Sequence, residues 1–195
     1  MSNEQTNKCF SALYDMKYCQ GSPVTPGIKR RAWVIAVDAI LGWPKIPVDE
    51  HGRPTSSEYA GGFTLAEGVK WRPLDHLPNK AEFKSEAQGE EPSRTFKVTG
   101  SFLHPKIDED AATASTSLLN TRVVVLVEDM RGKYRVIGCE QYNGALVTPS
   151  RDNGQGATGS AGTTILVEAD DPVETPFYPG PIDTADGIIN EAAGD

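Results

Sequence analysis

The segment at residues 121–139, TRVVVLVEDMRGKYRVIGC, constrains the fold of this chain more than any other. A run of valines and leucine at 123–127 is followed by turn residues ending in Gly132 and by a second β-rich run at 133–137. Two such runs around a short glycine-containing loop predict an antiparallel hairpin.

The first strand of this hairpin is apolar on both faces. Successive side chains of a strand point to opposite sides, so Val123, Val125 and Val127 face one way and Val124 and Leu126 the other. A strand of this kind must be covered on both sides, either inside a sandwich core or at a contact between subunits.

Other segments extend the β pattern. Strands are predicted at 28–37 and 63–74, with a bulge at Gly68, and at 163–169, and a second hairpin is predicted from 80–87 and 94–103. A helix is predicted at 108–119 with Asp108 as its N-cap, and the glycine-rich span 143–162 is predicted as loop. The predicted fold is mainly β, an antiparallel β-sandwich or barrel with one flanking α-helix and long loops.

The same pattern divides the chain into three parts. Residues 1–27 form an N-terminal arm, residues 28–178 the β-sandwich domain, and residues 179–195 a flexible acidic C-terminal tail. The loop at 38–62 is much longer than most connections, so we expect it to be either functional or disordered. Its apolar residues predict that it packs against another part of the structure.

Composition excludes several classes of function. A net charge of −8 disfavours binding to nucleic-acid phosphates, which needs a clustered positive face. The polar N-terminus does not resemble a signal peptide, and the longest apolar run, at 32–41, is too short to span a bilayer. We expect a chain made in the cytoplasm that has no membrane contact.

No catalytic, cofactor-binding or metal-binding residues are predicted. His51, His76 and His104 stand alone as surface or loop histidines, and Cys9, Cys19 and Cys139 lack zinc-site spacing. The glycines at 154–159 match GxGxxG, but a strand follows them instead of a helix. The acidic runs at 90–91, 108–110 and 170–171 are typical of solvated turns, and Cys139 is expected to be buried at a strand end. The chain is therefore expected to be neither an enzyme nor a cofactor-binding protein.

Aromatic and apolar residues outside the strands are the more informative candidates. They either cover the core of their own domain or anchor a neighbouring subunit, because aromatic residues are enriched in interface cores. The predicted subunit-interface residues are Trp43, Pro44, Ile46, Phe177 and Tyr178.

The run LLNTRVVVLVEDMRGKYRVIGC, with the downstream NGALVTPSRDNGQGATGSAGTTILVEADDPVETPFY, resembles virion proteins of phages and prophages of Bacteroidetes-type hosts. The upstream FTLAEGVKWRPL and AEFKSEAQGEEPSRTFKVTGSF follow the same layout, so the resemblance covers residues 27–178. These proteins are similar in plan to phage tail tube proteins, although the WPKIP loop and the acidic tail depart from the pattern.

The resemblance implies a structural virion protein of the phage tail, assembled in the cytoplasm of the bacterial host. Subunits of such a family join sheet edges into a ring, usually a hexamer, and rings stack through a long loop and terminal arms. Its partners are other copies of itself and other tail proteins, and DNA passes through the lumen without specific binding. Glu82 and Glu86, on the polar face of their strand, are candidates for the lumen wall.

Three alternatives stay open. The first is a β-sandwich module that binds carbohydrate or a receptor through exposed aromatic residues. The second is the tube protein of a contractile injection or type VI-like secretion system, which shares the fold of tail tubes. The third is a hydrolase that uses an unmarked pair of carboxylates.

Overall fold

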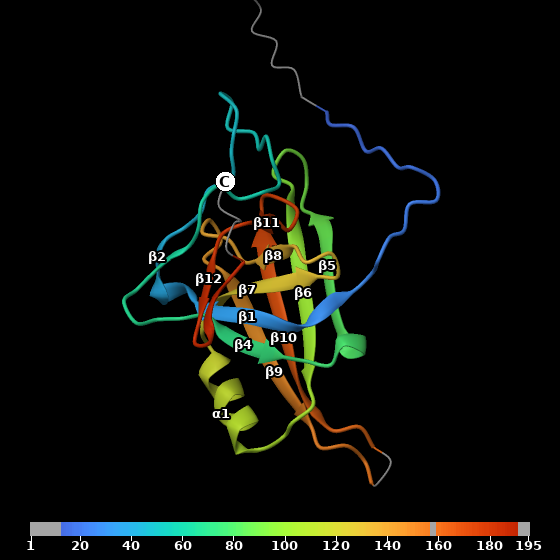
Figure 1. Ribbon diagram of the computed structural model, residues 1–195, viewed down its shortest axis with the longest axis vertical. Helices are drawn as coiled ribbons and strands as arrows, with labels where there is room; N and C mark the ends of the chain where they lie inside the picture. Colours follow the sequence, from blue (N-terminus) through green and yellow to red (C-terminus); the bar gives the residue numbers. More distant parts are fainter. Residues whose placement is uncertain (1–12, 157–158, 191–195) are drawn as a thin grey trace, which may run out of the picture.

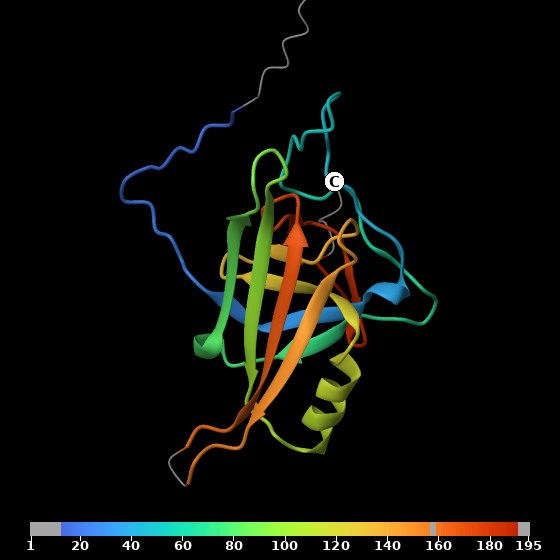
Figure 2. The ribbon, with the colours of Figure 1, turned by 180° about the vertical axis from the view of Figure 1, so that it is seen from behind.

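The computed structural model describes residues 13–156 and 159–190 of the chain. Within them, one nine-stranded antiparallel sheet folds into two layers, called here the first and the second sheet. The two layers lie face to face with their strands running crosswise, and a single α-helix lies at one end (Figures 1 and 2). The predicted class, a mainly β sandwich with one flanking helix and long loops, is confirmed.

Each sheet combines hairpins of consecutive strands with strands from distant parts of the sequence. The first sheet runs in the order β4 (Arg72–Asp75), β1 (Ile28–Ala36), β7 (Arg122–Asp129), β8 (Tyr134–Ile137) and β11 (Phe177–Tyr178). The second sheet runs in the order β9 (Ala145–Asp152), β10 (Gly162–Asp171), β6 (Thr95–His104) and β5 (Ala81–Gln88). The start of β7 also pairs with the start of β9, which joins the two sheets at one corner.

The space between the sheets holds the first hydrophobic core. Val123, Val125 and Val127 of β7 are at most 1% exposed and face the second sheet, which contributes Phe102 and Val167 at 0%. Strand β6 alternates between the two faces of its sheet, because Val98 and Phe102 are buried while Lys97 is exposed.

A second hydrophobic core lies on the opposite face of the first sheet. Val124 and Leu126 of β7 and Trp33 of β1 belong to it, together with Tyr59 and Trp71 from the long connection after β1. Both faces of β7 are thus covered by the chain itself. Of the two predicted settings, a sandwich core or a contact between subunits, the structure therefore shows the core.

The long connection after β1 forms much of this cover. It contains a helical turn (Val37–Ala39) and the short strands β2 (Ile40–Gly42) and β3 (Thr64–Leu65), which pair with each other. The prediction of one strand over 63–74 is wrong, because the chain turns between β3 and β4. Gly68, with φ +76°, takes the left-handed conformation that this turn requires, where a bulge was expected.

Strand β9 lies within the span predicted as a glycine-rich loop, so that prediction is also wrong. Ala145 and Val147 face the core and Leu146 and Thr148 face outward, a regular but short alternation. Pro149 disfavoured the prediction of a strand in this segment, because proline lacks a backbone N–H donor and is tolerated mainly at sheet edges.

The helix α1 (Glu109–Leu118) begins where predicted. Oδ1 of its N-cap, Asp108, accepts a hydrogen bond from the backbone N–H of Ala111 at 3.0 Å. Ala111 is buried and Leu118 packs against the first core, whereas Leu119 is 55% exposed. The helix contacts β9 and β10 and covers one end of the sandwich.

The C-terminal part of the domain extends further than predicted. Strands β12 (Ile182–Thr184) and β13 (Gly187–Ile189) form a hairpin, and Ile182 is 0% exposed in the second core. The prediction of a flexible tail from residue 179 is therefore wrong for residues 179–190, and residues 191–195 lie outside the described residues. At the other end, residues 13–27 of the predicted arm extend away from the sandwich, and residues 1–12 lie outside the described residues (Figure 1).

Candidate functional site

The outer face of the second sheet is a polar surface built on strands. Alternation along β5, β6 and β10 places four carboxylates and two lysines there: Glu82, Glu86, Glu168, Asp170, Lys84 and Lys97. Lys84 contacts Glu82 at 3.0 Å and Lys97 contacts Glu168 at 3.2 Å. The face therefore keeps a negative excess, and Glu82 and Glu86, the candidates for a lumen wall, both lie on it and are exposed.

Strand β5 ends the second sheet, and among the described residues it pairs with β6 alone. Half of the backbone N–H and C=O groups of a terminal strand point away from its partner. The Oγ atom of Ser85 on this strand is buried and has no hydrogen-bond partner among the described residues. This edge is the most extended unpaired backbone surface of the second sheet.

A groove of about 650 Å³ runs beside this edge, between β5 and the hairpin of β7 and β8. Arg131, Lys133 and Arg135, at alternate positions of the hairpin, line it. Arg135 stacks over Phe177 at 4.0 Å from the ring centroid and donates to Thr175. None of the three cations makes an ion pair with a carboxylate in the described part of the chain. Glu82, Asp129 and Glu174 line the same groove, so its wall carries charges of both signs.

The N-terminal segment carries exposed apolar groups. Tyr14, Met16 and Tyr18 are 68%, 100% and 69% exposed. The intervening Asp15 and Lys17 form an ion pair at 2.8 Å. Leu13 is also exposed, at 93%, so the segment presents four large apolar side chains to solvent without forming a strand.

The five predicted interface residues are all covered, at least in part, by their own chain. Tyr178 is 2% exposed and Pro44 is buried, while Trp43, Ile46 and Phe177 are partly buried. The hydroxyl of Tyr178 donates to Pro181 O at 2.9 Å and accepts from the backbone N–H of Phe63. A neighbouring subunit could contact only the parts of Trp43, Ile46 and Phe177 that remain exposed, so the interface role stays a prediction.

Phe63 is a site residue that sequence reasoning missed. Its ring lies 5.5 Å from Trp43, 5.4 Å from Trp71 and 5.1 Å from Tyr178, between centroids, at the centre of an aromatic cluster in the second core. These aromatic side chains, which a carbohydrate-binding platform would expose, instead hold the long loop and the C-terminal segment on the first sheet.

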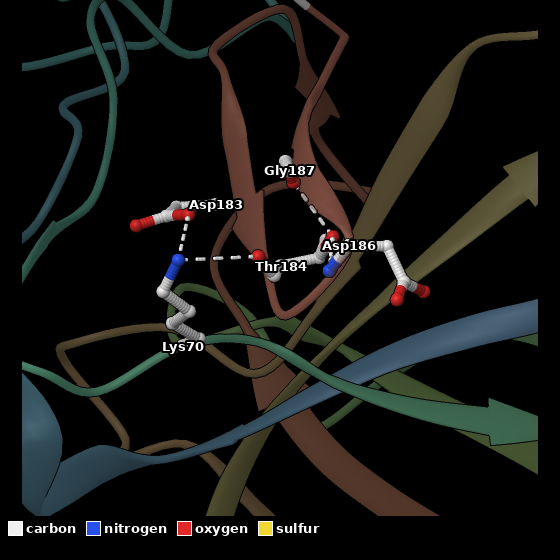
Figure 3. Close-up of polar contacts among 5 residues, drawn as sticks. All are labelled: Lys70, Asp183, Thr184, Asp186 and Gly187. Carbon is white, nitrogen blue, oxygen red and sulfur yellow. Dashed lines mark hydrogen bonds and ion pairs between the residues drawn. The ribbon is translucent and has the colours of Figure 1, made fainter.

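Polar contacts fasten the C-terminal hairpin to the segment before β4 (Figure 3). Lys70 Nζ lies 3.2 Å from Asp183 Oδ1 and 3.4 Å from Thr184 O, and the Thr184 hydroxyl donates to Gly187 O at 2.6 Å. The backbone N–H of Trp71 donates to Asp183 O at 2.9 Å. These bonds explain why the C-terminal segment is ordered despite its small and acidic composition.

Asp171 is a second residue that sequence reasoning missed. It is 2% exposed at the end of β10, and burial raises its pKa to about 6. Cys139 nearby is buried as predicted, and burial raises its thiol pKa to about 11, so the thiol is not activated as a nucleophile. The signal in the sequence was the apolar stretch before the Asp170–Asp171 pair, which continues strand alternation into it.

The three histidines and the glycine loop lie on separate segments, although His104 Nδ1 lies 2.7 Å from the backbone oxygen of Asp75, the residue before His76. His76 lies in the loop after β4, as one of the two predicted settings, but it is 4% exposed and stacks 5.2 Å from Phe102, so it is not a surface histidine. His51 lies in the long loop and His104 ends β6. Residues 154–156 and 159 belong to the hairpin loop between β9 and β10, and Cys9 and residues 157–158 lie outside the described residues.

The described residues include neither a cluster of metal ligands nor a helix that could cross a membrane. No group of three or more histidine, cysteine, aspartate or glutamate side chains among them is placed to hold a metal ion. None of their helices has the length and apolar character needed to cross a membrane.

The chain matches no protein-family model, no curated protein and no solved structure.

Proposed function

We propose that this protein is a tail tube-type subunit of a phage virion, which self-assembles into stacked rings around an acidic conduit for DNA. The observation that carries the proposal is the asymmetry of the second sheet. Its inner face packs on the first core, its outer face is polar, and β5 has an unpaired edge among the described residues.

An open sheet edge favours self-association. Unpaired backbone groups of an edge strand are a template for a strand of another chain, and a ring that closes by rotation pairs such edges. In this assembly β5 of one subunit joins the second sheet of the next, and the sheets form a continuous wall.

The charge of the outer face suits the wall of a DNA conduit. Its carboxylates outnumber its lysines, so DNA phosphates are repelled and duplex DNA can slide without being bound. In the proposed ring Glu82 and Glu86 face the lumen.

The N-terminal segment and the long loop supply contacts between rings. Tyr14, Met16 and Tyr18 bring exposed apolar side chains, and Leu41 and Val48 of the loop are 71% and 57% exposed. Burying such groups against a neighbouring ring stabilises stacking.

Negative-stain microscopy of the purified protein at high concentration tests the proposal, and it should reveal rings or short tubes. Lys84→Pro and Ser85→Pro provide a matched pair, because N–H groups of adjacent residues in an antiparallel strand point in opposite directions. The variant that loses an outward N–H should stay folded but fail to assemble, whereas the other should lose a bond to β6 and stability. A wild-type protein that is monomeric at every concentration would refute the proposal.

A further inference from the structure

A cavity of about 400 Å³ lies beneath the long loop, at the junction with the segment that follows β10. Its wall is mostly apolar and aromatic and includes Trp43, Ile46, Val48, Tyr59, Pro172 and Val173. Pockets of this size with apolar walls and a few polar groups are typical of small-ligand sites.

Asp171 is part of the cavity wall, and its carboxyl group is only half satisfied. Oδ1 accepts a hydrogen bond from the backbone N–H of Val173 at 2.9 Å. Oδ2 is buried and has no hydrogen-bond partner among the described residues. A buried carboxylate oxygen without a donor is rare in proteins, and it calls for a ligand, an ion or a water.

None of the charged and titratable groups that line the cavity donates a hydrogen bond to the Asp171 carboxyl group or forms an ion pair with it in the described part of the chain. Lys45 and Tyr59 come from the loop, and Cys139 and Glu140 come from the segment after β8. Lys45 and Glu140 are exposed, and in the described part of the chain Lys45 makes no ion pair. The thiol of Cys139 donates to Asp170 O instead of to the carboxyl group.

The lining favours an organic cation over a metal ion. Metal ions need several oxygen, nitrogen or sulfur ligands, and no group of three suitable side chains exists in the described residues. Aromatic rings and prolines instead suit a carbon stem, and aromatic faces attract ammonium and guanidinium groups.

We propose that this cavity binds an organic cation, whose ammonium or guanidinium N–H groups donate to Oδ2 of Asp171 and whose stem packs against Trp43 and Tyr59. The site goes beyond the proposed assembly function. Because Oδ2 is shielded from solvent, entry requires the loop over residues 43–54 to shift, and this loop is held by isolated bridges at Lys45 and Val48.

Calorimetric titration with butylguanidinium tests the site, with the uncharged N-butylurea as a probe of the same shape. The wild-type protein at neutral pH should bind butylguanidinium saturably and should bind N-butylurea at least about tenfold more weakly, as expected for one lost charged hydrogen bond. Asp171→Asn should weaken binding of butylguanidinium by a similar factor. Asp170→Asn is the matched control, because Asp170 lies on the other face of β10 and accepts from Gln88 instead.

A pH series on the wild-type protein gives a second readout if Asp171→Asn fails to fold. The affinity should fall as the pH drops through about 6, where the Asp171 carboxyl group takes up its proton. Absence of saturable binding by butylguanidinium, equal binding of both probes, or an affinity that ignores pH would overturn the proposal.

The cation can be a free compound or a basic side chain of a second copy, and sedimentation separates these sources. If a saturating amount of butylguanidinium dissociates an oligomer, the natural occupant is a side chain of a neighbouring copy. If the probe binds and the oligomer persists, the occupant is a free cation and assembly uses other surfaces. Failure of the ring proposal would leave a monomer that still binds the probe.

Discussion

At the scale of single residues, Asp171 and His76 are buried titratable groups with opposite effects on stability. Burial raises the pKa of Asp171 to about 6 and lowers the pKa of His76, because in both cases the neutral form is favoured. The neutral form of Asp171 dominates in acid and that of His76 in base. The pH dependence of stability therefore contains two separable contributions.

For Asp171, the folded state binds the proton more tightly than the unfolded state, whose carboxyl pKa is about 3.9. Its stabilising contribution is complete below about pH 4 and is lost as the pH rises through about 6. Relative to Asp171→Asn, the wild-type protein should lose on the order of 2–3 kcal/mol of unfolding free energy between about pH 4 and pH 8. Urea unfolding of both proteins across this range measures the difference, and parallel pH profiles would contradict it.

For His76, the folded state binds the proton less tightly than the unfolded state, whose imidazole pKa is about 6.5. The free energy of unfolding should fall as the pH drops below about 6.5. In His76→Phe this fall should be smaller, because the new phenyl ring can pack on Phe102 and cannot bind a proton. Thermal unfolding of both proteins at mildly acidic and neutral pH checks the prediction. An equal fall in the variant would contradict it.

At the scale of elements, β7 is the strand shared by both hydrophobic cores, because one of its faces packs in the first core and the other in the second. Val124 and Val125 are both 0% exposed and point to opposite sides. Val124→Asp and Val125→Asp should each destabilise the monomer by more than about 3 kcal/mol, since each buries an unpaired charge. Chemical denaturation measures both. Thr99→Asp, on the outer face of β6, is the control and should stay folded; a stable monomer with either valine variant would show that its face is not core.

The C-terminal hairpin offers a matched pair of isoleucines. Ile182 is 0% exposed in the second core, whereas Ile188 of the same hairpin is 54% exposed. Ile182→Ala should cost about 2–4 kcal/mol of unfolding free energy, and Ile188→Ala less than about 1 kcal/mol. Equal effects would indicate that the hairpin does not pack as described.

Elements with strong local patterns could be predicted from the sequence, and those fixed by distant contacts could not. Local sequence was enough to predict the valine run of β7, the alternation of β6 and the Asp108 cap of α1. Strand β9 contains a proline, and β12 and β13 are three residues long, so their order comes from neighbours across the fold. The burial of Asp171 could not be predicted for the same reason, because it depends on the distant loop that covers this residue.

At the scale of the whole molecule, the sandwich has one sheet covered on both faces and one covered on a single face. The covered sheet is closed by the long loop and the C-terminal hairpin. The other sheet presents a polar acidic face and the β5 edge. This asymmetry is what directs the proposed assembly.

The acidic face gives a prediction about DNA. Glu82→Lys with Glu86→Lys reverses the charge excess on the outer face of β5, β6 and β10, because two of the four carboxylates there become cations. The wild-type protein should not retard duplex DNA in an electrophoretic mobility assay, whereas the double variant should retard it at low salt and release it as salt rises. Retardation by the wild-type protein would contradict a conduit that does not bind DNA.

The most direct test of the central claim, that copies join through the edge of the second sheet, is amide hydrogen exchange at low and high protein concentration. If subunits pair at this edge, outward amides of residues 81–88 in β5 should become protected as concentration rises, while those of β1, already paired on both sides, should not change. Assembly without added protection in β5, or no assembly at all, would contradict the account.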